Sequence, residues 1–199
     1  MSPIAPGLAP ERDWSLKTGR PRSSGGTTYY TVPGVMFGSA GQLLTLLANT
    51  DYYATFFVST PIVVDQLAFE VTSLAAGSNA RIGLYPSDDD FQPAANAAPI
   101  TDSGDISVAS TGLKTFTPGT PIFLHRGTYQ TVLNSNGAPV VRAYSMSQTI
   151  DLTAGDLKVV RPHVARTYAA FPTPGTRWTA IASVANAGNY PVWLRISAP

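Results

Sequence analysis

The sequence contains no cysteine, few charged residues and only two histidines, and each shortage excludes a class of protein. Without cysteine the chain can form neither a disulfide framework nor a thiolate metal site, so its stability must come from packing. Charged residues make up 13% of the chain, well below the roughly 25% expected of a soluble domain. We infer that other chains cover part of the surface.

Low net charge and short apolar runs exclude two further classes. The formal net charge is +1, whereas nucleic-acid binders gain affinity by neutralising several phosphates, so no nucleic-acid partner is expected. The apolar runs are far shorter than the roughly 20 residues that span a bilayer, so no membrane insertion is expected. The first residues, MSPIAPGLAPERD, lack the basic start and apolar centre of a signal peptide. We therefore expect synthesis in a cytoplasm without a signal peptide.

Residues 1–41 are predicted to form an extended N-terminal arm, because prolines recur along them and forbid a long helix. Segments of this composition are usually disordered in isolation, and the arm has too few apolar residues for a core of its own. We interpret it as an anchor that lies on a neighbouring subunit or another protein. The candidate anchoring residues combine positive charges with isolated apolar side chains: Arg12, Trp14, Leu16, Lys17, Arg20 and Arg22.

The remaining residues, 42–199, predict one all-β domain. Short β-prone runs recur about every 8 to 12 residues with Gly, Pro, Asn or Ser between them, which is typical of a β-sandwich or barrel. No stretch long enough for a helix has apolar residues at helical spacing. This excludes a protein built of alternating strands and helices. Residues 42–48 fit either a helical turn or a strand. Residues 147–176 are expected to form an extended excursion. The expected strands are 52–58, 63–71, 81–85, 106–109, 113–117, 121–125, 129–134, 140–146, 177–184 and 191–197.

The clearest strand signal lies in residues 61–85, where apolar and polar residues alternate between positions 63 and 71. A cluster of small, turn-forming residues follows, and then a second short alternating run. We expect these two runs to form an antiparallel pair. The residues expected to fill the core are Val63, Leu67, Phe69, Val71, Ile82 and Leu84.

Candidate catalytic residues are few. His125 and His163 have no carboxylate or histidine partner at the spacing of metal ligands, so structural roles are expected for both. The nucleophile pattern G-x-S-x-G is absent. Asp65 and Glu70 fall on opposite parities of one strand, so they should not face each other as an acid pair. We expect no catalytic residue, no cofactor and no enzymatic activity.

Three adjacent aspartates, Asp88, Asp89 and Asp90, lie in the long connection 86–104. Carboxylates are calcium ligands, but the alternating spacing and distal glutamate of an EF-hand loop are missing. A solvated loop tip is the favoured interpretation, and calcium binding is left open.

Five aromatic residues in the C-terminal half have rings large and rigid enough to stack on a sugar or to contact another subunit: Tyr144, Tyr168, Phe171, Trp178 and Trp193. Most are expected in the core. Tyr168, Phe171 and Trp178 are the candidate glycan-binding or interface residues.

Several longer stretches resemble a known module. TPIVVDQLAFEVTSLAAGSNARIGLYPSDDD, ITDSGDISVASTGLKT, GTYQTVLNSNG and the closing NYPVWLRIS are similar to a β-sandwich module common in structural proteins of tailed phages and gene transfer agents. The resemblance covers roughly residues 50–197 and consists of packing and turn signatures. Arg81, Gly83 and Tyr85 would match the second core strand of the module, and Gly112 its following turn. The sequence departs from the module at 124–129, which leaves the strand boundaries there open.

The resemblance implies a non-enzymatic virion component such as a head spike, fibre or tail adhesin, made in a bacterial cytoplasm. Such proteins are homo-oligomers that attach to other virion proteins through an N-terminal region; a trimer is favoured here and a pentamer is the alternative. We therefore predict a jelly-roll-like antiparallel β-sandwich with an extended N-terminal arm. The alternative function is a carbohydrate-binding module that recognises a host surface polysaccharide through exposed aromatics.

Overall fold

The computed structural model describes residues 42–58, 61–88, 92–145, 150–151, 158–159, 163–177, 189–190 and 192–197. These residues form strands and connections without any helix, so they contain no helix that could cross a membrane. The expected arm, 1–41, lies outside them together with its six candidate anchoring residues.

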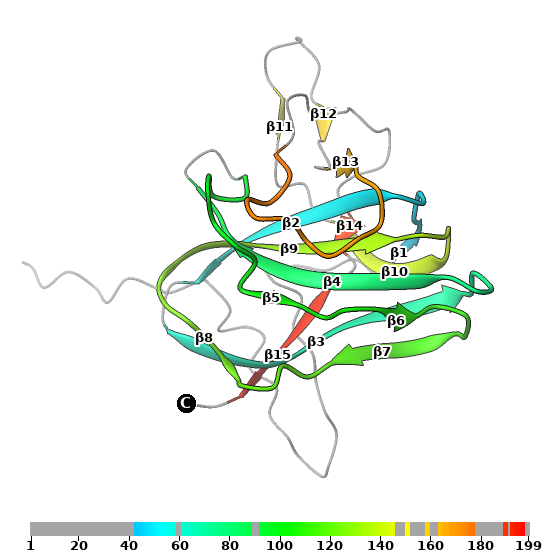
Figure 1. The fold of residues 1–199 in the computed structure, drawn as a ribbon, viewed down its shortest axis with the longest axis horizontal. Coiled ribbons are helices and arrows are strands. Elements are labelled where there is room, and N and C mark those ends of the chain that lie inside the picture. The colour runs from blue at the N-terminus through cyan, green and yellow to red at the C-terminus, as the bar shows by residue number, and fades with distance from the viewer. Residues whose placement is uncertain are drawn as a thin grey trace, which may run out of the picture.

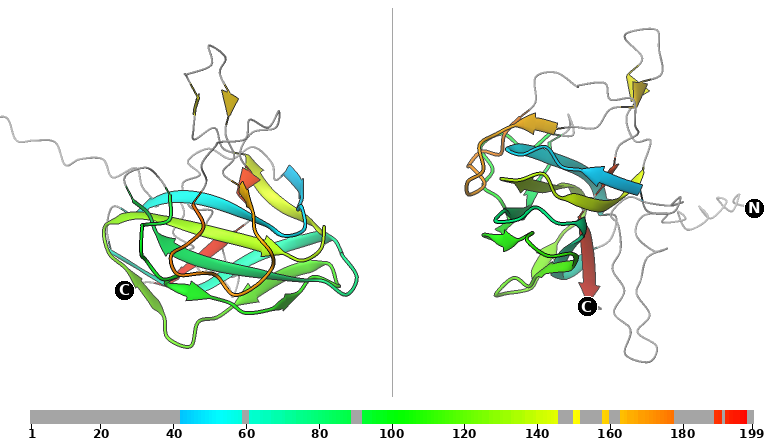
Figure 2. Two further views of the ribbon diagram at one scale, coloured as in Figure 1. Left: turned by 45° about the horizontal axis from the view of Figure 1, so that its top comes forward. Right: turned by 90° about the vertical axis from the view of Figure 1, so that its right-hand side faces the viewer.

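Two antiparallel sheets pack face to face (Figures 1 and 2). Sheet A contains β1 (Gln42–Thr45), β3 (Ile62–Ser73), β7 (Gly112–Phe116), β8 (Ile122–Leu124), β10 (Val140–Ser145), β14 (Asn189–Tyr190) and β15 (Trp193–Ser197). Sheet B contains β2 (Thr50–Val58), β4 (Asn79–Pro86), β5 (Thr101–Asp102), β6 (Ile106–Ser107), β9 (Gly127–Ser135) and β13 (His163–Ala165). A separate ribbon joins β11 (Ile150–Asp151) to β12 (Lys158–Val159).

The strand order is that of a jelly roll. In sheet A, β1 pairs β10, β10 pairs β3, and β3 pairs β7 and β8 along its other edge. In sheet B, β2 pairs β9, β9 pairs β4, and β4 pairs β5 and β6 along its other edge. Because the chain passes repeatedly between the sheets, the two orders together make the double Greek key of a jelly roll. The predicted jelly-roll-like antiparallel β-sandwich is confirmed.

The expected pairing of the two strands in 61–85 is wrong. β3 lies in sheet A and β4 in sheet B, and the small residues 74–78 carry the chain from one sheet to the other. Gly77 has φ of +67°, a conformation that glycine adopts without steric cost. The two strands bury their apolar faces toward each other across the core, which produces the same alternation in the sequence as a hairpin does.

A β-bulge in β3 changes which residues face the core. Opposite β3, Arg195 pairs Gln66 and Ile196 pairs Val64, which leaves Asp65 as an extra residue between them. The inward parity therefore shifts at this point: Val64 is fully buried and Val63 only half-buried. The expectation of Val63 in the core is corrected to Val64.

Because of the bulge, the expectation that Asp65 and Glu70 lie on opposite faces of one strand is wrong. Before the bulge the inward residue is Val64, and after it Leu67 and Phe69 are inward, so Asp65 and Glu70 share the outer face of sheet A. Each is paired with an arginine of a neighbouring strand: Asp65 with Arg195 and Glu70 with Arg142.

Residues 42–45 resolve as a strand, which decides between the two alternatives for 42–48. The excursion 147–176 contains β11, β12 and β13 among its described residues. Arg177 lies outside any strand, and the rest of the expected strand 177–184 is outside the described residues.

The core between the sheets is apolar and draws on both. Five of the six expected core residues, Leu67, Phe69, Val71, Ile82 and Leu84, are fully buried in it. They pack with Leu44, Leu46, Tyr52, Phe56, Val58, Val64, Ala80, Val108, Ile122, Leu124, Leu133, Val141, Ala143, Val192 and Leu194.

Candidate functional site

The outer face of sheet B is covered by the chain itself. After β13 pairs with the edge of β2, residues 163–177, which we call the covering segment, cross β2 and β9 toward β4 (Figure 1). Phe171 packs against Gly83, where an added Cβ would lie only 2.7 Å from the ring. The carbonyl of Pro172 accepts a 2.7 Å hydrogen bond from the hydroxyl of Tyr85. This segment forms a third layer on one side of the sandwich.

A buried carboxylate joins the covering segment to the sheet. Asp51 is fully buried at the start of β2, and Arg166 of the covering segment donates from Nε to Asp51 Oδ2 at 2.6 Å. Asn134 Nδ2 donates to Asp51 Oδ1 at 2.6 Å and to the carbonyl of Arg166 at 3.2 Å. Tyr53 donates its hydroxyl to Asp51 Oδ2 at 3.3 Å. Buried charges persist only when paired and hydrogen-bonded in this way.

Burial and this carboxylate also act on two tyrosines beneath the segment. Burial raises the pKa of Tyr53, and the negative charge of Asp51 raises it further. The pKa of Tyr85 is raised by the same two causes in the same order. Both phenols therefore remain protonated hydrogen-bond donors in the folded protein at neutral pH.

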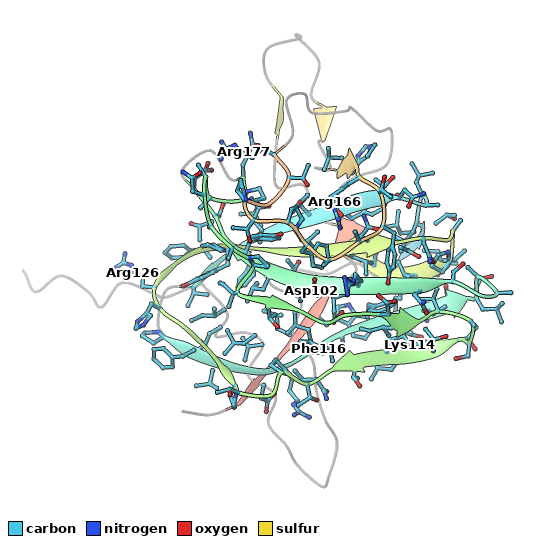
Figure 3. The ribbon with its side chains drawn as sticks, viewed as in Figure 1. Asp102, Lys114, Phe116, Arg126, Arg166 and Arg177 are labelled. Carbon is cyan, nitrogen blue, oxygen red and sulfur yellow. The ribbon has the colours of Figure 1, made fainter. Side chains whose placement is uncertain are left out.

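A second polar group holds the middle of the covering segment (Figure 3). The amide of Phe171 donates to Asp102 Oδ2 at 2.9 Å, and the hydroxyl of Tyr168 donates to Asp105 Oδ1 at 3.0 Å. Arg81 on β4 lies 3.6 Å from Asp102 and 3.3 Å from Asp105, and its guanidinium stands 5.9 Å from the centre of the Tyr168 ring. Desolvation by burial is the main cause that raises the pKa of Tyr168.

Through these ion pairs and hydrogen bonds most of the carboxylates near sheet B have a partner. Their role is therefore structural. Arg177 at the end of the covering segment likewise forms an ion pair with Asp88 and donates to the carbonyl of Pro93 at 3.0 Å. Within the part of the chain that the structure describes, no group of three or more His, Asp or Glu is placed to hold a metal ion. Asp89 and Asp90 lie outside that part.

The candidate aromatics occupy different environments. Tyr168 is half-buried with Arg81 over its ring. Phe171 is only 6% exposed and packs in a small second core with Tyr53, Tyr85 and Val132, so the expectation of a ring free to stack on sugar is corrected. Trp178 is outside the described residues.

The two histidines are far apart in the fold. His163 pairs Tyr52 in the register of β13 with β2, and its ring stacks on the Tyr52 ring at a centroid distance of 6.0 Å. His125 is exposed beside Phe123, with ring centroids 4.8 Å apart.

The outer face of sheet A carries exposed apolar side chains. Leu43 on β1 and Leu113 on β7 stand at the two ends of one cross-strand row, with the Arg142–Glu70 pair between them. Phe123 on β8 is 54% exposed and lies opposite Val63. The outer face of sheet A therefore presents separate exposed apolar side chains among ion pairs, whereas sheet B is closed by the covering segment.

No protein-family model matches this chain, and no curated protein is significantly similar to it. Function must therefore be argued from the geometry and from the motifs of the sequence.

Sequence reasoning missed the covering segment and the buried centre at Asp51. A signal was present, because an aspartate inside an aromatic-rich strand is a charge that needs a buried partner. The sequence could not choose that partner among 13 lysines and arginines, because Arg166 meets Asp51 only through the fold.

Proposed function

We propose that the protein is a non-enzymatic structural component of a phage or phage-like particle, such as a head spike, fibre or tail protein. Residues 1–41 anchor it to other virion proteins, and the β-sandwich is exposed. The observation that supports this most is the jelly-roll architecture, which is common in viral capsid proteins and lectins. A jelly roll alone does not decide function, so the proposal also rests on the phage-like motifs.

The charge distribution of the described residues supports a contact role. The carboxylates Asp51, Asp65, Glu70 and Asp88 each have an arginine partner, and therefore contribute to folding. The exposed apolar side chains of sheet A offer area for contact with other subunits.

The anchor is tested by particle incorporation. We would express the full-length chain, a chain lacking residues 1–41 and a full-length chain with the six candidate anchoring residues changed to Ala, and measure each in purified particles. The expected result is incorporation of the full-length chain and loss of both variants. Normal incorporation of the variants overturns the anchor, and absence of the full-length chain from every particle overturns the virion role.

A carbohydrate-binding module is the second candidate, and a spike could also bind sugar. Phe57 and Phe123 are exposed aromatic rings of the kind that stacks on pyranose faces. A glycan array with the wild type, Phe123→Ala and Phe57→Ala tests it. Binding to surface polysaccharides that either substitution weakens would support this candidate, and no binding to any glycan would remove it.

A further inference from the structure

The turn between β9 and β10 contains Asn136 followed by Gly137, an amide side chain next to a residue without a side chain. The turn lies at the right-hand end of Figure 1. Asn136 is exposed, whereas Ser135 before it is fully buried. In such a pair the backbone nitrogen of the glycine can attack the side-chain amide of the asparagine, because no Cβ shields that nitrogen. The contacts of the turn bear on each atom that takes part in this reaction.

A backbone amide polarises the side-chain carbonyl of Asn136. The amide of Asn79, the first residue of β4, donates to Oδ1 of Asn136 at 2.7 Å. When a nucleophile adds to Cγ, negative charge develops on this oxygen, and a fixed donor at this distance stabilises that charge. The backbone amide of Asn136 donates in turn to the carbonyl of Asn79 at 3.1 Å, which keeps the two residues together. The donor is therefore in place before the reaction begins.

The attacking nitrogen of Gly137 is held by a hydroxyl group. The amide of Gly137 donates to Oγ of Ser135 at 3.2 Å, and the Ser135 hydroxyl donates to the carbonyl of Asn79 at 2.9 Å. Because the hydroxyl proton points to that carbonyl, a lone pair of Oγ faces the N–H of Gly137 and can take up its proton. Loss of this proton makes the nitrogen nucleophilic.

The side-chain nitrogen of Asn136, which leaves in this reaction, is not held in the same way. Among the residues that the structure describes, none accepts a hydrogen bond from Nδ2 of Asn136, and the residue is exposed to solvent. This nitrogen can therefore take up a proton and depart into water as ammonia.

Packing requires glycine at the position that follows. An added Cβ at Gly137 would collide with Ser78 and would lie 3.2 Å from the Cβ of Ala75. Any other residue would have to displace the turn between β3 and β4. The fold therefore keeps the residue type that leaves the attacking nitrogen most open.

We propose that Asn136 is a site of spontaneous deamidation in the folded protein. The nitrogen of Gly137 forms a bond to Cγ of Asn136, and its proton passes by way of Ser135 and water to the departing side-chain nitrogen. The bond between Cγ and Nδ2 breaks, which releases ammonia and leaves a cyclic imide. Water then adds to one of the two carbonyls of the imide and opens the ring to aspartate or to isoaspartate. Solvent water is the only co-reactant.

The two products differ in their effect on the turn. Aspartate leaves the main chain unchanged and keeps an oxygen for the amide of Asn79. Isoaspartate adds a methylene group to the main chain beside the close contact of Gly137 with Ser78. We therefore expect the isoaspartate form to unfold at a lower urea concentration than the unmodified protein.

Peptide mapping of the full-length chain tests the site. The protein would be incubated in neutral and in mildly alkaline buffer, digested with trypsin and analysed by tandem mass spectrometry, with an unincubated sample as reference. Trypsin releases the peptide 127–142, which also contains the fully buried Asn134. We expect the acid to appear at position 136 and not at 134, together with ammonia. We expect its rate in the folded chain to be at least equal to that in the same chain unfolded in urea.

Asn96 is a matched control within the same chain. It is exposed on a turn, as Asn136 is, but the residue that follows it is Ala97, whose Cβ shields the backbone nitrogen. Asn96 should therefore stay intact. The variant Ser135→Ala removes the hydroxyl beside the Gly137 amide and should convert more slowly than the wild type. Circular dichroism shows whether this variant is folded.

Two results would overturn the inference. They are an Asn136 that stays intact in the folded chain or converts there more slowly than in urea, and conversion of Asn96 as fast as that of Asn136. An unchanged rate in folded Ser135→Ala would overturn the role of its hydroxyl. Because the reaction requires neither a particle nor a partner, its outcome is independent of the proposed virion role.

Discussion

Arg166 Nε lies 2.6 Å from Oδ2 of the fully buried Asp51, and this ion pair joins the covering segment to the first strand of sheet B. The two residues are 115 positions apart in the chain. The guanidinium of Arg166 also stands 5.1 Å from the centre of the Phe171 ring. One side chain thus connects the buried charge, the small second core and the covering segment.

Arg166→Ala should strongly destabilise the protein, because Asp51 would remain buried without its cation. Breaking a buried pair by removing one partner costs about 3 to 5 kcal/mol. Urea denaturation measures the loss in free energy of unfolding. Trypsin should also cleave after Arg177 faster than in the wild type, because the covering segment loses its main attachment to the sheet.

Arg195→Ala is the control for that prediction. Its partner Asp65 is partly exposed on sheet A, and such pairs contribute roughly 0 to 1 kcal/mol. Equal losses in free energy of unfolding for Arg166→Ala and Arg195→Ala would show that the buried pair has no special role.

Gly83→Ala should be destabilising by about 1 to 3 kcal/mol, the usual cost of overpacking. The added Cβ would lie 2.7 Å from two ring carbons of Phe171 and 3.0 Å from the carbonyl oxygen of Thr101. Adding Phe171→Leu should recover part of the loss, since the ring is the main obstacle. Thermal unfolding of both variants and the double mutant measures the coupling.

Gly119→Ala serves as the matched control, because nothing lies within 4 Å of the position its Cβ would take. We expect a change in stability close to zero for this variant. A loss as large as that of Gly83→Ala would contradict the steric explanation.

The protein should lose stability as the pH rises above about 10, the ordinary pKa of tyrosine. In the folded state burial raises the pKa of Tyr53 and of Tyr85, so both remain protonated while the unfolded chain releases their protons. The stability that they contribute is complete below about pH 10 and declines above it, by roughly 1.4 kcal/mol per pH unit for each group. Urea denaturation at a series of alkaline pH values measures the slope.

Tyr53→Phe should make that alkaline decline shallower, since one of the phenols with a raised pKa is removed. The part of the tyrosinate absorbance that Tyr53→Phe removes should rise together with unfolding and not before it. Ionisation of both phenols in a still-folded protein would contradict the prediction.

Residues 42–199 should fold without the arm. The core residues that the structure describes, from Leu44 to Leu194, form a cluster drawn from both sheets within this part of the chain. Circular dichroism and the cooperativity of urea unfolding of the truncated chain test this, with the full-length chain as reference. A truncated chain that unfolds without a cooperative transition would show that the arm belongs to the folding unit.

The apolar periodicity of the sequence sufficed for the fold class. Alternation at residues such as Leu67, Phe69 and Ile82, together with regular turn formers, predicts strands buried on one face, and those residues are in the core. The periodicity could not assign the partner of each strand. β3 buries the same residues whether it faces β4 across the core or is hydrogen-bonded to β4 in one sheet. The shift from Val63 to Val64 also escaped prediction, since a bulge depends on the register with β15.

The sequence by itself determined that this chain is all-β, free of disulfides and poor in charge, because composition and period are local properties. Only the tertiary structure decided which sheet each strand joins, that 163–177 closes sheet B, and that the turns at 46–49, 74–78, 108–111 and 136–139 lie together at one end. The reason is physical: a buried charge such as Asp51 requires a partner but does not specify it. Contacts between residues distant in the chain, as between Asp51 and Arg166, choose that partner only when the whole sandwich forms.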